Sequence, residues 1–529
     1  MCVLYFSVYK EEHILCKYDL VKQWIAEGFI CAKGDAEKVA IGYFVELVEM
    51  GMVQPVHVKH NGEVLSCTVH YMILHYIRYK RIEENFITAI NHSQTNTGLA
   101  DTVRRLSLHY GDTADAEPPA KLKLSQIRSF FCFGLFRCLP SLEEFRLVRV
   151  MILHLWSDQD STNFDLTTLC KLFGLRYLEI AYNAILNLQS RLQGLQHLEI
   201  LKIDSRVNEV PPDFFHLVGL LHLSLPVDTN PMTLLHNPSS NSSLQDLRLI
   251  FSTIPCNKLE ENIEKLALVV SKLEKLKYLT LSFSCSSKAN TLETSRNNIS
   301  CDGLSNVSSP PRLIERLHLS LRFCIFSNLP MRIGELGNLC ILKIAVRQLS
   351  SDNVDILKRF CALDALSLYV QTAPEGRIVF DDKGFLVLKY SKFICSSACV
   401  GFMEGAMPNI RRLKLGFNAK TVHHYRLIDA GFKHLTGLEG ISAKIGCVDA
   451  QNHRKVAYST LDAAFSPRTV NIQWMDPIFV GTEAQRTKHE NLGKSNVITN
   501  ESLDENYEIS IEASSEQTPA DRRYTFQEL

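Results

Sequence analysis

The sequence has no long apolar run and no excess of charge of either sign. No stretch approaches the roughly twenty apolar residues of a transmembrane helix. Residues 1–13 lack the basic region and the long apolar core of a signal peptide. The 57 basic residues equal the 57 acidic ones, so net charge favours neither nucleic acid nor an anionic membrane as a partner. We therefore expect a cytoplasmic chain with no membrane span.

Paired cysteine motifs are also missing. The chain has 16 cysteines, but they are scattered and form no CxxC pair. Cys395 and Cys399 are the nearest to a motif, and no His/Cys cluster completes a metal site. We interpret these cysteines as reduced thiols, many of them at core positions such as Cys361.

Motifs for catalysis and for nucleotide binding are absent as well. The sequence contains no GxSxG, no HExxH and no GxGxxG after a strand, so we expect no enzyme. It contains no P-loop GxxxxGK[ST]. The nearest stretch, GDAEKVAIG from Gly34, lacks the Gly-Lys-Ser/Thr end and lies in a helical pattern. We therefore expect no cofactor in this chain.

What the chain does contain is a repeat. LRYLEI from Leu175, LEILKI from Leu198 and LLHLSL from Leu220 each have apolar residues at positions one, four and six. Their spacing of a little over twenty residues is the period of leucine-rich repeats. Burying three aliphatic side chains contributes about 5–9 kcal/mol, whereas ordering a whole unit costs about 1–2 kcal/mol per residue. One unit is therefore unstable alone, and a stacked solenoid is predicted.

The pattern extends over residues 103–481. Within it, residues 284–311 are rich in Ser and Asn and are predicted to be an excluded loop, and Tyr458 to Phe465 is predicted to be a terminal helix that caps the array. The polar tail, residues 482–529, is predicted to be disordered. Further candidate strands begin at Val103, Ile127, Leu147, Leu244, Leu276, Ile314, Leu339, Leu363, Phe385, Ile410 and Leu438.

Residues 1–80 are not repetitive and form a separate domain. Asp19 is predicted to cap a helix over LVKQWIAEGF, and residues 34–50 form a second helix. Asn61-Gly62 between MVQPVHV and VLSCTV predicts a β-hairpin, and HYMILHYIRYK forms a further helix. The predicted fold is therefore α/β: a mainly helical winged-helix domain, a linker over residues 81–102, and a curved leucine-rich-repeat solenoid.

These segments resemble plant intracellular immune receptors of the nucleotide-binding leucine-rich-repeat family, in the coiled-coil class found in grasses. The resemblance lies in CVLYFSVYKEEHILCKYDLVKQWIAEGFI, AIGYFVELVEMGMVQPV, CTVHYMILHYI, IEENFITAI and FMEGAMPNIRRLKLGF. It implies an ADP/ATP switch in full-length relatives, built mainly by a nucleotide-binding region upstream. It also implies that this chain begins within the winged-helix subdomain and lacks the coiled coil.

His70 aligns with the histidine that contacts the ADP phosphate in this family. The motif's usual Met is Val69 here, and its usual Asp is Tyr71, which cannot supply a carboxylate. Besides this resemblance, His70 has a simpler interpretation, as a histidine at a strand–helix junction satisfied by backbone groups.

The outward positions of the repeat strands are the candidate protein-binding residues. Solenoids expose a large concave surface, so we expect this surface to bind protein. The family resemblance implies that the partner is a pathogen effector or a guarded host protein, and that the repeats restrain the nucleotide-binding region. The alternative for each residue is a solvated face without a partner. The candidates are Tyr177, Glu179, Ile200, Lys202, His222, Ser224, Asp246, Arg248, Ile341, Lys343, Arg412 and Lys414.

Two other functions fit the sequence less well. A winged helix can bind DNA, but the helix that would enter the groove carries Glu46 and Glu49, which repel phosphate, so no nucleic-acid partner is expected. A repeat protein can also be a substrate adaptor of a ubiquitin ligase. That function requires an N-terminal F-box, and nothing before Lys80 resembles one.

Overall fold

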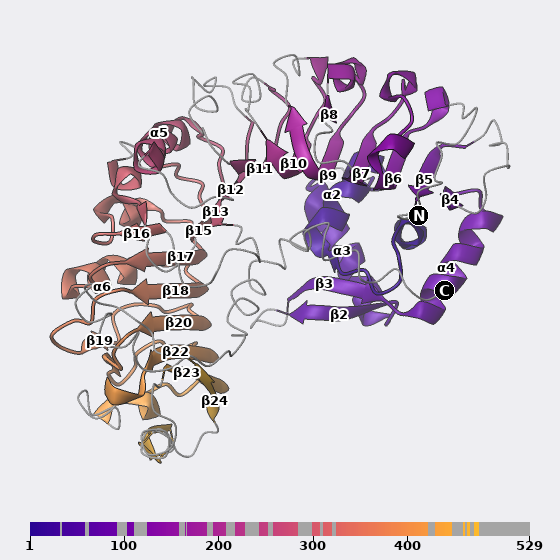
Figure 1. Ribbon diagram of the computed structural model, residues 1–529. Coiled ribbons are helices and arrows are strands. Elements are labelled where there is room, and N and C mark those ends of the chain that lie inside the picture. Colours follow the sequence, from indigo (N-terminus) through magenta and orange to yellow (C-terminus); the bar gives the residue numbers. More distant parts are fainter. Residues whose placement is uncertain are drawn as a thin grey trace, which may run out of the picture. The chain divides into compact units, whose positions relative to one another are not determined.

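The computed structural model contains two compact units, one formed by Met1–Ser252 and one by Thr253–Asn500. Figure 1 shows the helices and strands of each. The structure describes residues 1–31, 34–58, 63–91, 103–110, 124–157, 164–165, 167–187, 194–207, 217–227, 243–251, 258–283, 299–306, 310–319, 324–421, 429–446, 459–460, 463–465 and 470–475.

Four helices form most of the N-terminal domain. The helix for which Asp19 was the predicted cap begins three residues earlier, because Cys16 is its N-cap and Asp19 lies in its first turn. It ends at Gly28, whose φ of 79° is accessible to glycine without strain. Asp35 caps the next helix by accepting hydrogen bonds from the backbone N–H groups of Glu37 and Lys38. The helices are α1 (Cys2–Tyr5), α2 (Lys17–Glu27), α3 (Ala36–Glu49) and α4 (Tyr71–Glu83).

A small antiparallel sheet completes this domain. It contains β1 (Leu15–Cys16), β2 (Val53–Val58) and β3 (Val64–Val69) in the order β1-β3-β2. The antiparallel pairing of β2 with β3 confirms the predicted hairpin. Its predicted Asn61-Gly62 turn lies outside the described residues.

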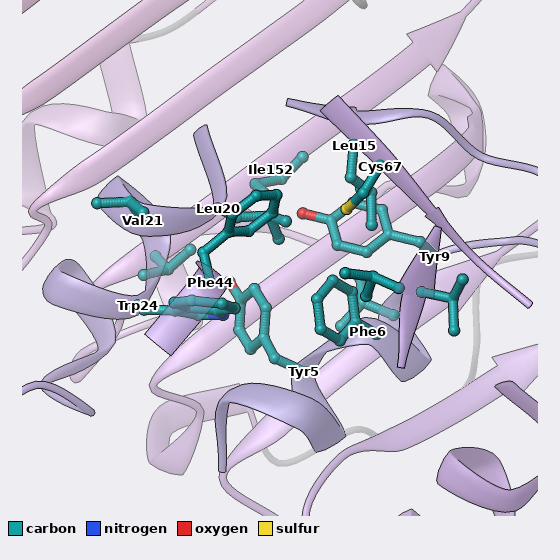
Figure 2. Close-up of a cluster of buried hydrophobic side chains, with 14 of the residues drawn as sticks. Tyr5, Phe6, Tyr9, Leu15, Leu20, Val21, Trp24, Phe44, Cys67 and Ile152 are labelled. Atoms are coloured by element: carbon teal, nitrogen blue, oxygen red, sulfur yellow. The ribbon is translucent and has the colours of Figure 1, made fainter. Parts of the chain in front are cut away.

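Aromatic side chains fill the core of the domain, as Figure 2 shows. The rings of Phe6 and Trp24 meet edge to face, with centroids 6.1 Å apart. Trp24 and Phe44 have no exposed surface. Buried residues recur at helical spacing on both helices, as Leu20 and Trp24 on α2 and Ala40, Phe44 and Leu47 on α3, so each helix presents one apolar stripe to this core.

A parallel sheet forms the repeats of the first unit. Its neighbours pair in chain order, because each strand is followed by a limb that returns to the next one. The short strand β8 pairs with β9. The strands are β4 (Thr88–Asn91), β5 (Arg105–His109), β6 (Ser129–Leu135), β7 (Val150–Trp156), β8 (Phe164–Asp165), β9 (Tyr177–Asn187), β10 (Ile200–Val207), β11 (His222–Val227) and β12 (Asp246–Phe251).

Two features of this sheet differ from the sequence prediction. The sheet starts at β4, within the predicted linker, because Thr88 to Asn91 pair in parallel with β5. The repeat predicted from Leu147 is displaced by one residue, since Leu147 is exposed and Val148 is buried. That displacement assigned the residues of β7 to the wrong faces.

A second parallel sheet forms the other unit. Its main strands pair in the order β13-β15-β17-β18-β20-β22-β23-β24, and shorter pairs, β14 with β16 and β19 with β21, accompany them. The strands are β13 (Tyr278–Phe283), β14 (Ile299–Ser300), β15 (Arg316–Leu319), β16 (Cys324–Phe326), β17 (Ile341–Val346), β18 (Ala365–Val370), β19 (Ile378–Phe380), β20 (Tyr390–Cys395), β21 (Val400–Phe402), β22 (Arg412–Asn418), β23 (Gly440–Gly446) and β24 (Val470–Met475).

Helical segments connect many of the strands. Ser350 caps α6 in a capping box with Asn353. The helices are α5 (Lys258–Lys272), α6 (Ser351–Lys358) and the 3-10 helices η1 (Phe6–Val8), η2 (Leu124–Gln126), η3 (Phe136–Cys138), η4 (Leu142–Glu144), η5 (Thr167–Lys171), η10 (Asp302–Asn306), η11 (Met331–Glu335), η12 (Ala419–Thr421) and η14 (Phe432–His434).

Three predictions for the second unit need correction. Part of the predicted excluded loop is ordered: β14 pairs with β16, and Asp302 accepts hydrogen bonds from Ser327. The strand predicted from Phe385 begins at Tyr390, because Leu388 supplies the first buried position. Cys361 is exposed rather than at a core position.

The end of the array also differs from expectation. A strand, β24, follows the predicted terminal helix and pairs with β23, so residues 470–475 continue the sheet. Part of the predicted helix and the whole predicted disordered tail lie outside the described residues. No helix in the described part of the chain is long and apolar enough to cross a membrane.

Adjacent residues on α3 offer a matched test of this packing. Phe44 is fully buried, whereas Tyr43 is 41% exposed. Phe44→Ala should lower the free energy of unfolding by about 3–5 kcal/mol, because it leaves a cavity in the aromatic core. Tyr43→Ala should lower it by less than about 1 kcal/mol. Urea unfolding of both variants measures the difference, and equal losses would contradict the orientation of α3.

Candidate functional site

The predicted surface residues of the first unit form two rows across its strands. Strand register places Tyr177, Ile200, His222 and Asp246 side by side. The same register places Glu179, Lys202, Ser224 and Arg248 in a second row. These side chains alternate with the buried leucines, so they point away from the solenoid core. We call the outward side of strands β5–β12 the first concave face.

The N-terminal domain occupies part of this first concave face. Tyr177 has no exposed surface, and Glu179 and Ile200 are 6% and 7% exposed. Tyr177, Ile200 and Ile152 belong to the same apolar cluster as Trp24 and the rest of the N-terminal core. The interpretation of Tyr177, Glu179 and Ile200 as surface open to a foreign partner is therefore corrected, because all three are buried, and Tyr177 and Ile200 pack against the chain's own N-terminal domain.

Charged side chains lie beneath this contact. The Asp19 carboxylate of α2 accepts a hydrogen bond from Lys202 Nζ at 2.9 Å. Glu179 Oε1 lies 3.4 Å from the same ammonium and 3.1 Å from His154 Nε2, and Glu179 Oε2 accepts a 2.6 Å hydrogen bond from the Tyr177 hydroxyl. Lys202 thus lies between one carboxylate from each side of the contact.

This arrangement keeps both partners charged. Burial by itself would raise the pKa of Glu179, but Lys202 and His154 outweigh it and hold that pKa well below its ordinary value. Burial would likewise lower the pKa of Lys202, but the carboxylates of Asp19 and Glu179 outweigh it and raise the pKa. Removal of one partner would leave a buried charge uncompensated, which is far more costly than loss of an exposed pair.

Two further ion pairs flank this centre. Lys22 Nζ lies 3.3 Å from Asp246 Oδ2, and His222 Nδ1 contacts the same oxygen at 3.3 Å. Arg105 Nε donates to Glu27 Oε2 at 3.1 Å. The Arg105 guanidinium also lies 5.0 Å and 4.5 Å from the ring centres of Phe29 and Phe86.

Sequence reasoning missed several of these residues. His154 lies beyond the six-residue pattern that begins at Val148, so the third and fifth positions used to choose outward residues do not include it. Asp19, Lys22 and Glu27 are polar residues of α2, three and five positions apart in a helix that also contains Lys17 and Gln23. Their pattern in the sequence therefore gave no signal of a partner on the repeat strands. The repeat period shows which strand residues point outward, but it does not show what covers them.

His70 lies outside this contact, at the start of α4. It is the N-cap residue, and its Nδ1 accepts a 3.3 Å hydrogen bond from the Met72 N–H. Its ring lies 4.6 Å from that of Tyr71, which is largely exposed. This geometry matches the simpler interpretation, a junction histidine satisfied by the backbone, while the phosphate role stays a prediction.

The remaining predicted residues belong to the second unit. Ile341 and Lys343 point outward from β17, and Arg412 and Lys414 point outward from β22. Arg412 is exposed, and the Lys414 ammonium lies 5.7 Å from the Tyr390 ring centre. Among the described residues, no group of His, Cys, Asp or Glu could hold a metal ion.

Comparison with known families accounts for both parts of this architecture. Residues 8–77 match the winged helix domain of disease resistance proteins. Residues 126–466 match a leucine-rich repeat region, which covers more than half of the chain. The chain belongs to the plant disease resistance proteins. Neither matched region is an enzyme family in itself.

Several rice proteins are similar to this member of the family. Disease resistance protein RGA5 of Oryza sativa subsp. japonica is 39% identical over 90% of this chain and 44% of its own length. Pik-2 and RGA4 from the same organism are 31% and 28% identical, each over 42% of this chain and 22% of their own length. The chain thus spans less than half the length of these disease resistance proteins.

A solved structure is also similar, but only weakly. The plant peptide hormone receptor RGFR1 in complex with RGF2 aligns with a TM-score of 0.39 and 12% identity. The alignment covers 73% of this chain and 62% of the receptor chain. A likeness at this level supports no conclusion about function.

The contact between Asp19 and Lys202 can be measured by a double-mutant cycle. Asp19→Asn and Lys202→Met should each lower the free energy of unfolding by about 2–4 kcal/mol, because each removes one counter-charge from a largely buried group of ion pairs. The pair should show a coupling energy of about 1–3 kcal/mol.

The exposed pair of Lys171 and Glu143, 2.8 Å apart, is the control. Its coupling should be below about 0.5 kcal/mol, since solvent screens it. Equal coupling energies for the two pairs would show that α2 does not bind the first concave face in solution.

Proposed function

We propose that this chain is the sensing and restraining part of an intracellular plant immune receptor. Its outward strand residues bind a pathogen effector or a host protein that an effector modifies. Its N-terminal domain couples that event to a nucleotide-binding region, as the resemblance to the family implies. The observation that carries the proposal is the packing of the winged-helix region on the first concave face.

That packing supplies a physical means of restraint. The contact combines an apolar cluster with the ion pairs of Asp19, Lys22 and Glu27. The N-terminal domain can be packed on the strands or separated from them. A partner that binds the strands near this contact stabilises the separated state by the difference between its binding free energies for the two states, and by no more than that. The restraint is therefore adjustable by binding to the repeats.

The outer face of α4 is the proposed contact for a nucleotide-binding region. Met72, Tyr76, Tyr79 and Ile82 are each at least 60% exposed on this helix. Aromatic and apolar side chains gathered on one helix are typical of a surface that binds another protein region. His70 caps the same helix, so a partner on this face would also meet the histidine of the family motif.

Cytoplasmic localisation is part of this proposal. It is supported by the family to which the chain belongs and by the cysteines of the sequence, whose scattered positions do not indicate a disulfide framework. An effector or a guarded host protein would be met in that compartment.

Nucleotide binding gives a first test. This chain should show no saturable heat with ADP and Mg²⁺ at micromolar concentration in calorimetry, because its sequence contains no P-loop to cradle the phosphates. His70→Ala should give the same flat titration. Saturable binding that is lost in His70→Ala would contradict this view and assign the phosphate contact to this chain alone.

Proximity labelling in infected leaf tissue tests the sensing role. The full chain should label a pathogen protein, or a host protein enriched on infection, and the Arg412→Glu/Lys414→Glu variant should lose most of that label. Lys433→Glu/Lys171→Glu changes the same charge at exposed positions outside the strands and should keep it. A proteome limited to chaperones, or equal loss in both variants, would count against sensing by these strands.

A further inference from the structure

Two buried cysteines meet at one corner of the second unit. Cys395 is the last residue of β20, and Cys399 immediately precedes β21. Neither side chain has exposed surface, and both thiols are free. The Cys399 thiol donates a hydrogen bond to the sulfur of Cys395, so the two sulfur atoms are in contact. The corner therefore holds a dithiol within one repeat.

Backbone hydrogen bonds hold the turn that joins the two cysteines. The Cys399 N–H donates to the Ser397 carbonyl at 2.9 Å, and the Cys399 carbonyl accepts from the Ile378 N–H at 2.7 Å. The following repeat contributes as well, because the Ala398 N–H donates to Thr421 Oγ1 at 3.2 Å. The contact between the thiols is thus part of the folded repeat and is supported from both of its neighbours.

Hydrogen-bond donors converge on the sulfur of Cys395. Besides the Cys399 thiol, they are the hydroxyl and the backbone N–H of Ser396 and the backbone N–H of Ser397. The hydrogen bond from Cys399, together with these donors, outweighs burial and lowers the pKa of the Cys395 thiol. The same bond and burial raise the pKa of the Cys399 thiol. Because the thiolate is the reactive form, Cys395 is the nucleophile of the pair and Cys399 is its partner.

A buried cysteine more often serves only as a small apolar side chain. Cys16 shows what burial does in that case, since it raises the pKa of that thiol to about 12. Cys395 is equally buried but has donors around its sulfur and a second thiol against it. Those two features distinguish the corner from an ordinary core position.

We infer that Cys395 and Cys399 form an oxidation site, at which hydrogen peroxide converts the dithiol into a disulfide within one repeat. The Cys395 thiolate attacks a peroxide oxygen, the O–O bond breaks, and a sulfenic acid forms as hydroxide leaves. The Cys399 sulfur then attacks the Cys395 sulfur. An S–S bond forms, the S–O bond breaks, and the leaving hydroxide takes the Cys399 proton. In sum, two thiols lose two electrons and two protons, and one peroxide becomes two water molecules.

The disulfide would join β20 of the main sheet covalently to the start of β21. The turn also contacts the next strand, because the Ser396 carbonyl accepts a 3.1 Å hydrogen bond from the N–H of Asn418, the last residue of β22. Oxidation would therefore alter one defined junction between repeats. This site does not depend on the proposed sensing function.

Burial determines which oxidant can reach the pair. Hydrogen peroxide is small and uncharged, so a local opening of the corner is enough to admit it. Glutathione disulfide is larger and charged, so it should react first with exposed thiols such as Cys31 and Cys361. The two oxidants should thus modify different cysteines of the same chain.

Mass spectrometry of one tryptic peptide tests this inference. Cleavage after Lys392 and Arg411 releases residues 393–411, which contain Cys395, Cys399 and no other cysteine. The full chain is treated with hydrogen peroxide, unfolded, alkylated with N-ethylmaleimide and digested. The peptide should carry no alkyl group and be lighter than the reduced peptide by two hydrogen atoms. Reduction with dithiothreitol before alkylation should restore both alkylation sites.

Two outcomes with the unmodified chain would overturn the inference. One is alkylation of both cysteines at a peroxide concentration that already oxidises Cys361. The other is a Cys395 sulfinic or sulfonic acid formed without any disulfide. Glutathione disulfide should modify Cys361 and leave the 393–411 peptide fully alkylated, and a pair that reacts equally well with it would contradict the closed corner. These measurements need no substitution, so they do not depend on how a variant folds.

Serine variants test which sulfur is the nucleophile. In Cys399→Ser, dimedone should trap a sulfenic acid on Cys395 after peroxide treatment. In Cys395→Ser, dimedone labelling of Cys399 should be about tenfold lower, since its sulfur lacks the donors that favour a thiolate. Cys361→Ser removes an exposed thiol of the same unit and should leave the disulfide yield within about twofold. Equal labelling in the first two variants would refute the assignment of Cys395 as nucleophile.

Discussion

Trp24 of α2 packs in the same apolar cluster as Ile152, Tyr177 and Ile200 of the repeat strands. Outward positions of a solenoid sheet are ordinarily in contact with water, yet Tyr177 has no exposed surface here. The first unit therefore has one continuous core where its sequence suggests two separate domains. Apolar contact is not directional, and the ion pairs of Asp19 and Glu27 restrict how α2 can lie on the strands.

The repeats themselves depend on a simpler constraint, the inward Leu and Ile of each strand. Those residues fix the strand spacing and register, whereas the segments that connect the strands are free to vary. This freedom explains why one connection is a fifteen-residue helix, α5, while others are single 3-10 turns such as η4. It also explains why a Ser- and Asn-rich stretch still contributes β14 to the sheet.

The six-residue pattern was sufficient to predict most strands, because burial of positions one, four and six is a local property of the sequence. It failed where two apolar residues compete for one position, as Leu147 and Val148 do, and where a strand is as short as β4. It could not predict that Tyr177 and Glu179 are covered, since coverage depends on residues about 150 positions away. At His70, the family resemblance indicated a phosphate-contacting motif, but the local geometry of His70 is that of an ordinary helix N-cap.

One position of the repeat pattern carries lysine in both units of this chain. On β10, Lys202 meets carboxylates from α2 and from β9, so its charge is balanced within the fold. On β17, β20 and β22, the same position is lysine again, and Lys343 and Lys392 are 5% and 7% exposed there. The repeat thus keeps a lysine at this position where its ammonium has little contact with water, and such burial is sustained only where opposite charge compensates it.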